Sequence, residues 1–200
     1  MYLGATTDPN VCMPLFFIAF IVAILFSIGI LQHNKFTYCL MEASRALGLK
    51  YIDGGFFYDP KLKGEYKGVK VSVYTFTKHR GDNKAKYTRV EALHKSDLRG
   101  QISISKDDIF TTVGDKLGVH EIHIMGTVFD NEYHIKGSNE DEVLRILDRE
   151  LQDRIMKYGL ALDITEDKVI HEHKGYIVDK KHLHDAIELV VETVERINKK

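Results

Sequence analysis

Two histidines separated by one residue, His171 and His173, have the spacing in this chain that best suits chemistry. They fall on a predicted strand, where residues two apart project from the same face, so both imidazoles could reach one metal ion. A zinc site needs three or four protein ligands, and the sequence around this pair supplies no obvious third one. His171 and His173 are therefore weak candidates for a metal-binding or hydrolytic site.

The remaining candidate groups argue against catalysis. His182 and His184 begin a predicted helix about 200° apart, so their side chains do not converge. Asp130 is interpreted as a turn residue rather than a catalytic acid, because Asp readily hydrogen-bonds the backbone two residues on. The chain has no GxSxG nucleophile motif, no phosphate-binding P-loop and no GxGxxG fingerprint. We predict no catalytic residue and no cofactor, which favours a protein that is not an enzyme.

Positive charge is concentrated between residues 61 and 89, where nine cations are opposed only by Glu65 and Asp82. The net charge of −1 hides this polarity, since residues 130–172 hold twelve acidic and six basic side chains. Near a membrane, such a segment could contact anionic headgroups or another protein, or it could be an ordinary solvated surface. Nucleic acid is not predicted, because no RNA-binding signature accompanies the cations. The candidate contact residues are Lys61, Lys63, Lys67, Lys70, Lys78, Arg80, Lys84, Lys86 and Arg89.

An apolar run precedes the charged segment. Residues 15–31 read LFFIAFIVAILFSIGIL, and the uncharged stretch begins at Val11. As a helix rising about 1.5 Å per residue, this stretch spans about 30 Å, the thickness of a bilayer's hydrocarbon core. A cleaved signal peptide would need a basic start and a small-residue cleavage site, and neither is found. We predict a transmembrane anchor over residues 1–33, in contact with membrane lipid through residues 11–31.

The charges around this anchor predict its orientation. No Lys or Arg precedes the apolar run, whereas Lys35, Arg45 and Lys50 follow it. Because cytoplasmic flanks carry the excess of positive charge, we expect a single-pass protein of the cell membrane with its N-terminus outside and its large domain in the cytoplasm. Cys12 and Cys39 lie at opposite ends of a predicted helix about 40 Å long, so they should not form a disulfide with each other.

The segment after the anchor carries a second apolar pattern. Phe36, Leu40, Ala43 and Leu47 follow helical spacing and predict a short helix over residues 34–48. This helix either lies on the membrane surface or continues the anchor and packs on the domain, and the sequence leaves both alternatives open. We expect a juxtamembrane helix and linker over residues 34–59.

The remaining residues, 60–200, are predicted to form one soluble α+β domain. Strands are predicted at 62–66, 69–77, 86–93, 101–105, 119–125, 132–136, 160–165, 168–173 and 176–178. A polar loop is predicted at 78–84, and helices at 107–117, 138–158 and 183–197. Many strands interspersed with few helices favour an antiparallel sheet with two or three amphipathic helices on one face.

A short motif resembles a known family. The sequence FDNEYHIKG at residues 129–137 has a Phe-Asp pair, an aromatic residue three positions after the Asp, and then aliphatic and small residues. A helix bearing Leu144 and Leu147 follows it, and residues 62–71 (LKGEYKGVKV) form a strand pair before it. The chain is in these respects similar to a family of uncharacterised prokaryotic membrane-anchored proteins, over residues 60–195. The resemblance implies an architecture and no activity.

Three functions remain open on the sequence alone. The first is a membrane-tethered, non-catalytic interaction module, such as an accessory subunit of a larger assembly with other membrane proteins. The second is a metal-binding or hydrolytic domain that uses His171 and His173. The third is a domain that binds lipid at the cytoplasmic leaflet through its basic segment.

Overall fold

The structure is a computed structural model that describes residues 9–55, 58–80, 83–96, 98, 100–106, 120–124 and 128–199. The side chains of residues 9–16 and of Arg80 are not among the parts described. The helix predicted at 107–117 lies outside the described residues.

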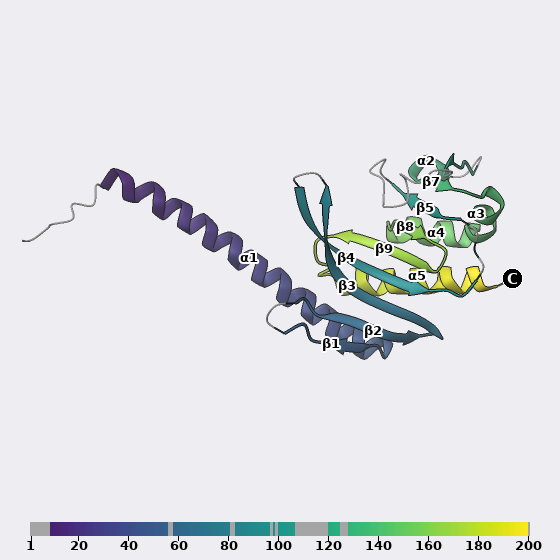
Figure 1. Ribbon diagram of the computed structural model, residues 1–200, viewed down its shortest axis with the longest axis horizontal. Helices are drawn as coiled ribbons and strands as arrows, with labels where there is room; N and C mark the ends of the chain where they lie inside the picture. The colour runs from purple at the N-terminus through teal and green to yellow at the C-terminus, as the bar shows by residue number, and fades with distance from the viewer. Residues whose placement is uncertain are drawn as a thin grey trace, which may run out of the picture.

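A single helix, α1 (Pro9–Leu47), leads into the domain (Figure 1). Its apolar side chains from Phe17 to Leu31 are all exposed, and its mean hydropathy reaches 1.9. By length and composition, this helix could cross a membrane. In the described part of the chain it is the one helix with this property.

The C-terminal turns of α1 belong to the hydrophobic core. Phe36, Leu40 and Leu47 are buried, together with Cys39 and Ala43. The helix runs on without a break past residue 33, so the segment predicted at 34–48 continues the apolar helix and packs on the domain. The helix ends at Gly48, whose φ of +68° provides the left-handed conformation common at helix ends.

All nine described strands form one antiparallel sheet in the order β1-β2-β3-β4-β9-β8-β5-β7-β6. Residues 50–93 supply the first four strands as a meander, and the β8–β9 hairpin from the end of the chain joins β4 to the second half of the sheet. The strands are β1 (Lys50–Ile52), β2 (Lys61–Tyr66), β3 (Val69–Arg80), β4 (Asn83–Leu93), β5 (Ile102–Ser105), β6 (His120–Glu121), β7 (His134–Gly137), β8 (Leu162–Ile164) and β9 (Lys168–Lys174).

The hairpin formed by β3 and β4 is longer than the sequence predicts. Residues 78–84, predicted as a polar loop, are mostly strand: Lys78 pairs with Ala85, and His79 pairs with Lys84. Polar side chains do not prevent this pairing, because the ladder bonds join backbone groups and both faces of the sheet are solvated there. The loop prediction was therefore wrong, and the hairpin projects well beyond its neighbours in Figure 1.

The described residues form four further helices: α2 (Val128–Glu132), α3 (Glu140–Ile146), α4 (Arg149–Tyr158) and α5 (Lys180–Asn198). The single helix predicted at 138–158 is divided, because the Asp148 side chain accepts a hydrogen bond from the Leu151 amide and starts α4. Asn139, not Ser138, caps α3. The strand predicted at 176–178 is not formed.

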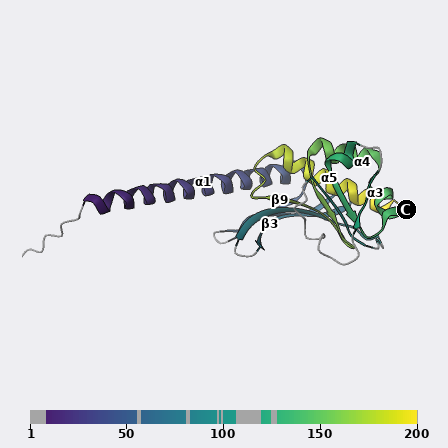
Figure 2. The ribbon, with the colours of Figure 1, turned by 90° about the horizontal axis from the view of Figure 1, so that it is seen from above.

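The helices cover one face of the sheet (Figure 2). The central helix, α5, packs on β3, β4 and β9 and is itself flanked by α1 and α4. Its buried residues include Leu183, Ile187 and Val190, which follow the predicted apolar stripe. The α+β class, with an N-terminal apolar helix and an antiparallel sheet, is confirmed. None of the described helices lies on the opposite face of β2, β3, β4 and β9, which is called the open face below.

Candidate interaction surface

The alternation of side chains assigns each residue of the sheet to one face. Val73 and Val90 lie opposite each other on the helix-covered face and are fully buried. Their neighbours Tyr74 and Arg89 therefore project from the open face. By the same alternation, the open face holds Lys61, Lys63, Lys70, Tyr74, Phe76, Lys78, Tyr87, Arg89 and Glu172.

Aromatic rings and cations interleave at the centre of the open face. The ring centroid of Phe76 lies 5.9 Å from that of Tyr87 and 6.5 Å from that of Tyr74. The Arg89 guanidinium lies 4.4 Å from the Phe76 centroid, and the Lys78 ammonium lies 5.2 Å from the Tyr87 centroid. Each such cation–π contact contributes about 0.5–2 kcal/mol. The cluster rigidifies the longest hairpin of the sheet.

One carboxylate anchors this cluster. The Glu172 side chain is only 6% exposed, and it accepts hydrogen bonds from Arg89 Nε at 3.0 Å and from the Lys78 ammonium. Burial lowers the pKa of Arg89, but the hydrogen bonds to Glu172 and Tyr74 outweigh it and hold the pKa above its usual value. Lys78 and Arg89, two of the predicted contact residues, thus take part in the internal structure of the sheet.

The other predicted contact residues are divided among three places. Lys61, Lys63 and Lys70 lie on the open face, and none of them forms an ion pair with a described residue. Lys84 lies near the end of the β3–β4 hairpin, as does the backbone of Arg80. The remaining two cations bind carboxylates on or near the helix-covered side, Lys67 with Glu188 and Lys86 with Asp59.

Asp59 joins α1 to the sheet. Its carboxylate lies 2.8 Å from the Lys86 ammonium, 2.9 Å from the Tyr176 hydroxyl and 3.3 Å from His33 Nδ1 on α1. Thr75 also donates a hydrogen bond to it. Burial alone would raise the pKa of the Asp59 carboxyl, but the bonds from Lys86, Thr75 and Tyr176 outweigh it and lower the pKa. Asp59 therefore carries a negative charge beside the helix at neutral pH.

The histidine pair lies between the sheet and α5. His171 is buried, and its Nδ1 is 2.8 Å from the Ala161 carbonyl oxygen, so the Nδ1–H tautomer is the one that can donate. The ring of His182, from α5, lies 5.9 Å from that of His171 and 5.1 Å from that of His173. Burial lowers the pKa of His171 to about 4, and burial also lowers the pKa of His173.

His182 is the neighbour that sequence reasoning missed. Its angle to His184 on the helix was the wrong comparison, because the packing of α5 on β9 brings His182 to the pair. Even so, no group of three or more His, Cys, Asp or Glu side chains in the described ranges is placed to hold a metal ion. Metal binding by His171 and His173 stays a prediction, to be tested by metal analysis of the purified protein.

The Phe-Asp motif has a structural use. Phe129 and Tyr133 are one helical turn apart, buried, and stacked with ring centroids 4.6 Å apart. The Tyr133 hydroxyl donates to the Ile155 carbonyl oxygen at 3.1 Å, and burial raises the Tyr133 pKa to about 12. Asp130 lies within α2 and accepts a hydrogen bond from the Ile124 amide at 3.0 Å. The turn predicted at Asp130 was therefore wrong, since this Asp fixes a preceding segment instead.

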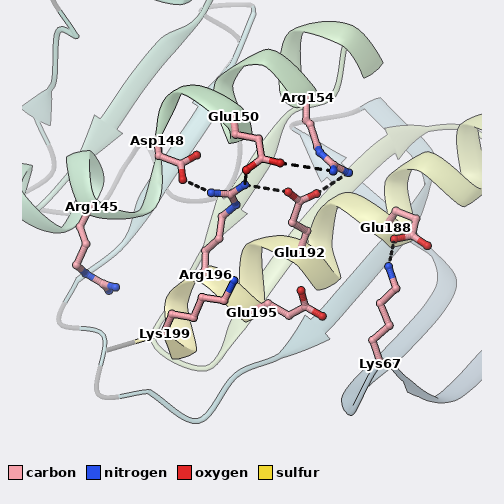
Figure 3. A pocket seen from close by; sticks show the side chains of 10 residues that line it. All are labelled: Lys67, Arg145, Asp148, Glu150, Arg154, Glu188, Glu192, Glu195, Arg196 and Lys199. Carbon is pink, nitrogen blue, oxygen red and sulfur yellow. Dashed lines mark hydrogen bonds and ion pairs between the residues drawn. The ribbon is translucent and has the colours of Figure 1, made fainter.

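A charged groove of about 520 Å³ lies between α4, α5 and the β2–β3 turn (Figure 3). Arg196, only 14% exposed, reaches Asp148, Glu150 and Glu192, and so joins the two helices. Arg154 bridges Glu150 and Glu192 in the same way. Five cations and five carboxylates line this groove, so its charges balance and it serves to hold α4 on α5.

Comparisons with known proteins support the fold alone. No protein-family model and no curated protein sequence matches the chain, which is consistent with an uncharacterised family. A solved structure that is similar is the mycobacterial trehalose monomycolate transport factor A, TtfA, with a TM-score of 0.58. The alignment has 8% sequence identity and covers 84% of this chain and 94% of the TtfA chain.

Proposed function

We propose that this chain is a membrane-tethered, non-catalytic interaction module that acts as an accessory factor of a larger membrane protein assembly. The observation that carries the proposal is the continuity of α1. Its apolar stretch is exposed along its whole described length, and the same helix ends inside the domain core. A bilayer would cover the exposed stretch, and the buried turns would then hold the domain in a fixed orientation to the membrane.

The open face is the surface offered to a partner. Its edge carries Lys61, Lys63 and Lys70, which form no ion pair with any described residue. Aromatic side chains and Arg, such as Tyr74, Phe76 and Arg89 beside them, are enriched in protein interfaces. Because α1 fixes the domain, a partner in the same membrane would meet this face at a constant distance from the bilayer.

The structural neighbour agrees with an accessory role. TtfA is described as a transport factor, and it shares the fold over most of both chains. From TtfA we extend to this chain only the role of a factor that serves a membrane process. We do not extend to it the lipid that is named in the description of TtfA.

The proposal places the domain in the cytoplasm. Lys35 follows the apolar stretch and is exposed on α1, and Arg45 and Lys50 come soon after it, which is the charge bias expected of a cytoplasmic flank. Protease treatment of intact and of opened cells checks this orientation. Digestion of the domain in intact cells would contradict it.

The interaction is tested by affinity purification of the full chain from native membranes in a gentle detergent. We expect a stoichiometric membrane protein to co-elute with the wild-type chain, and the triple variant Lys61→Glu, Lys63→Glu, Lys70→Glu to lose it. These side chains make no internal ion pairs among the described residues, so the substitutions should change stability by no more than about 0.5 kcal/mol each.

The matched control makes the same change of charge on the side of the domain that the helices cover. Arg149, Lys157 and Lys199 are exposed on or beside α4 and α5. The triple variant Arg149→Glu, Lys157→Glu, Lys199→Glu should retain the partner. Loss of the partner in both triple variants would refute the open face as the contact surface, and a wild-type chain that elutes alone would refute the accessory role.

A further inference from the structure

Two lysines face each other across the edge of the sheet. In the antiparallel pairing of β1 with β2, Lys50 lies directly opposite Lys63. Tyr51 and Leu62 form the next pair, and Leu62 is fully buried in the core, so the two lysines project from the open face. Side chains that lie directly opposite each other have Cβ atoms about 4.5–5.5 Å apart, and like charges at this distance destabilise a sheet.

A third lysine belongs to the same corner of the open face. Lys61 lies two residues before Lys63 on β2 and therefore shares its face. None of Lys50, Lys61 and Lys63 forms an ion pair with a residue that the structure describes. Glu65, the next residue on this face of β2, is placed in register with Lys70 instead. The repulsion is thus not relieved within the described part of the chain, and such a local conflict is typical of a functional site.

A hollow of about 600 Å³ adjoins these lysines where β2 begins. Lys61 and Lys63 line it, together with the aromatic side chains of Tyr58, Tyr74 and Phe76. This volume is within the range of ligand-binding pockets, and the combination of cations with aromatic rings suits a ligand that is partly anionic and partly apolar.

The two carboxylates in the hollow are already bound. Asp59 accepts the hydrogen bonds from Lys86, Thr75 and Tyr176 described above. Glu91 accepts a hydrogen bond from the Tyr74 hydroxyl at 3.0 Å and lies 3.6 Å from the ammonium group of a lysine on β9. The charges of the hollow that remain for a ligand are therefore positive.

The lysine pair lies away from any bilayer that α1 would cross. From Leu31, the last residue of the apolar run, to Leu47 there are sixteen residues, about 24 Å along the helix axis. Lys50 follows Leu47 by three residues, which span at most about 11 Å. Lys50 and Lys63 are therefore at least about 13 Å beyond the apolar run, and a helix tilt of about 20° removes only about 1–2 Å of this. Because the headgroup layer is about 5–8 Å thick, a protein is favoured over lipid as the ligand.

We propose that Lys50, Lys61 and Lys63, with the adjoining hollow, bind an acidic segment of a partner protein that carries an apolar side chain. The inference rests on the proposed function and deepens it, because it names the chemistry by which the open face recognises its partner. The carboxylates of the segment neutralise the three cations, and the apolar side chain lies against Tyr74 and Phe76. Complementary charges of this kind give an interface its specificity and speed its formation.

The test uses the full chain in nonionic detergent micelles and a fluorescently labelled peptide with glutamates on both sides of one phenylalanine. We expect saturable binding, measured by fluorescence anisotropy, that weakens as salt is added. A peptide with glutamines in place of the glutamates should not bind. The double variant Lys50→Gln, Lys63→Gln should weaken binding roughly fivefold, since each exposed ion pair contributes a factor of about 1.4–5.

The matched control removes two cations from the helical layer. Arg149 and Lys157 are exposed on α4, and the double variant Arg149→Gln, Lys157→Gln should bind the peptide as the wild type does. A second measurement separates loss of the contact from loss of the fold. Because Lys50 and Lys63 repel each other, Lys63→Gln should raise the Tm of the unbound chain by up to about 3 °C at low salt while it weakens binding. A lysine with a purely structural role would lower Tm when replaced.

Several results would overturn the inference. They are a wild-type chain that shows no salt-sensitive binding, a glutamine peptide that binds equally well, and equal weakening by the two double variants. In nanodiscs at physiological salt, adding phosphatidylglycerol to phosphatidylcholine should leave the affinity unchanged, since charges are screened beyond about 8 Å. Loss of peptide binding there would assign the lysines to lipid headgroups instead. A partner protein that still co-purifies through the open face would leave the proposed function standing, so the two failures are distinguishable.

Discussion

Replacing Phe36 by Ala tests whether α1 and the domain form one folded unit. Phe36 is fully buried where α1 meets the domain, and its ring centroid lies 5.0 Å from that of Tyr176. Removing a buried Phe side chain costs about 3–5 kcal/mol, from lost burial and from the cavity left behind. For a domain of this size, each kcal/mol shifts the melting temperature by about 2–4 °C. We therefore expect Phe36→Ala to lower Tm by roughly 6–20 °C.

The measurement is thermal unfolding of the full chain in detergent micelles, followed by far-ultraviolet circular dichroism. Met41→Ala is the matched control, because Met41 lies on the same helix but is 37% exposed. Met41→Ala should lower Tm by only a few degrees, since the Met41 side chain is partly in solvent and its removal leaves little buried cavity. If Phe36→Ala melted with the wild type, the end of α1 would not be part of the core, and a separate helix on the membrane surface would be the better description.

Three further substitutions probe the junction, the histidine cluster and the charged groove. Asp59→Asn should lower Tm at neutral pH, and the difference in Tm from the wild type should vanish in acid. The pKa of the Asp59 carboxyl is lowered in the folded protein, so its charge stabilises the fold at pH values above the ordinary pKa of 3.8, and this contribution is lost as pH falls through the folded pKa. Folding lowers the pKa of His171 from 6.5 to about 4, so the unfolded chain binds a proton at a higher pH than the folded protein does. The free energy of unfolding should therefore fall by up to roughly 3 kcal/mol as pH drops from 6.5 to about 4, and His171→Leu should flatten the dependence of Tm on pH over the same range. Arg196→Met should cost about 1.5–3 kcal/mol in a denaturation experiment, since it removes hydrogen bonds to charged partners. Arg45→Met, which breaks a surface pair on α1 away from the groove, should cost less than about 1 kcal/mol. Equal losses for the two arginine variants would refute the role given to the groove.

Local pattern was enough to predict most of the elements. The hairpin of β2 and β3 follows from alternating apolar residues and the Lys67-Gly68 turn, where both residues have positive φ. The final helix follows from the apolar stripe that starts at Leu183. In both cases the residues that carry the pattern are close in sequence, so the spacing of apolar residues within one element is enough to predict that element.

Errors arose where a tertiary contact decided the outcome. The break between α3 and α4 depends on Asp148, which caps α4 and also pairs with Arg196 some fifty positions later. The strands around Lys78 and Lys84 extend because each supplies the other's backbone partners, and no apolar pattern marks that stretch. The Asp148 cap is itself a local signal that the sequence interpretation did not use, whereas its pairing with Arg196 and the extension of the two strands have none.

The candidate surface was predicted in composition but not in arrangement. The sequence places nine cations in one segment, but it does not reveal that Lys78 and Arg89 share the buried carboxylate of Glu172. That carboxylate comes from β9, which pairs with β4 in the sheet but follows β5, β6, β7 and β8 in the chain. Likewise, His182 reaches His171 through helix packing and not through spacing.

The end of α1 constrains the domain, because the helix that carries the exposed apolar stretch also ends inside the core. A domain on a flexible linker would present its surfaces to the membrane in many orientations, whereas Phe36 and Leu40 are buried in the same core as the sheet residues Val73 and Val90. Reorienting the domain relative to α1 would therefore expose apolar surface worth several kcal/mol, at about 1.5–3 kcal/mol for each large side chain. The open face and the β3–β4 hairpin are consequently held at fixed positions relative to the apolar stretch of α1. This geometry favours the proposed function of positioning a partner at the membrane, since such a function needs a constant orientation.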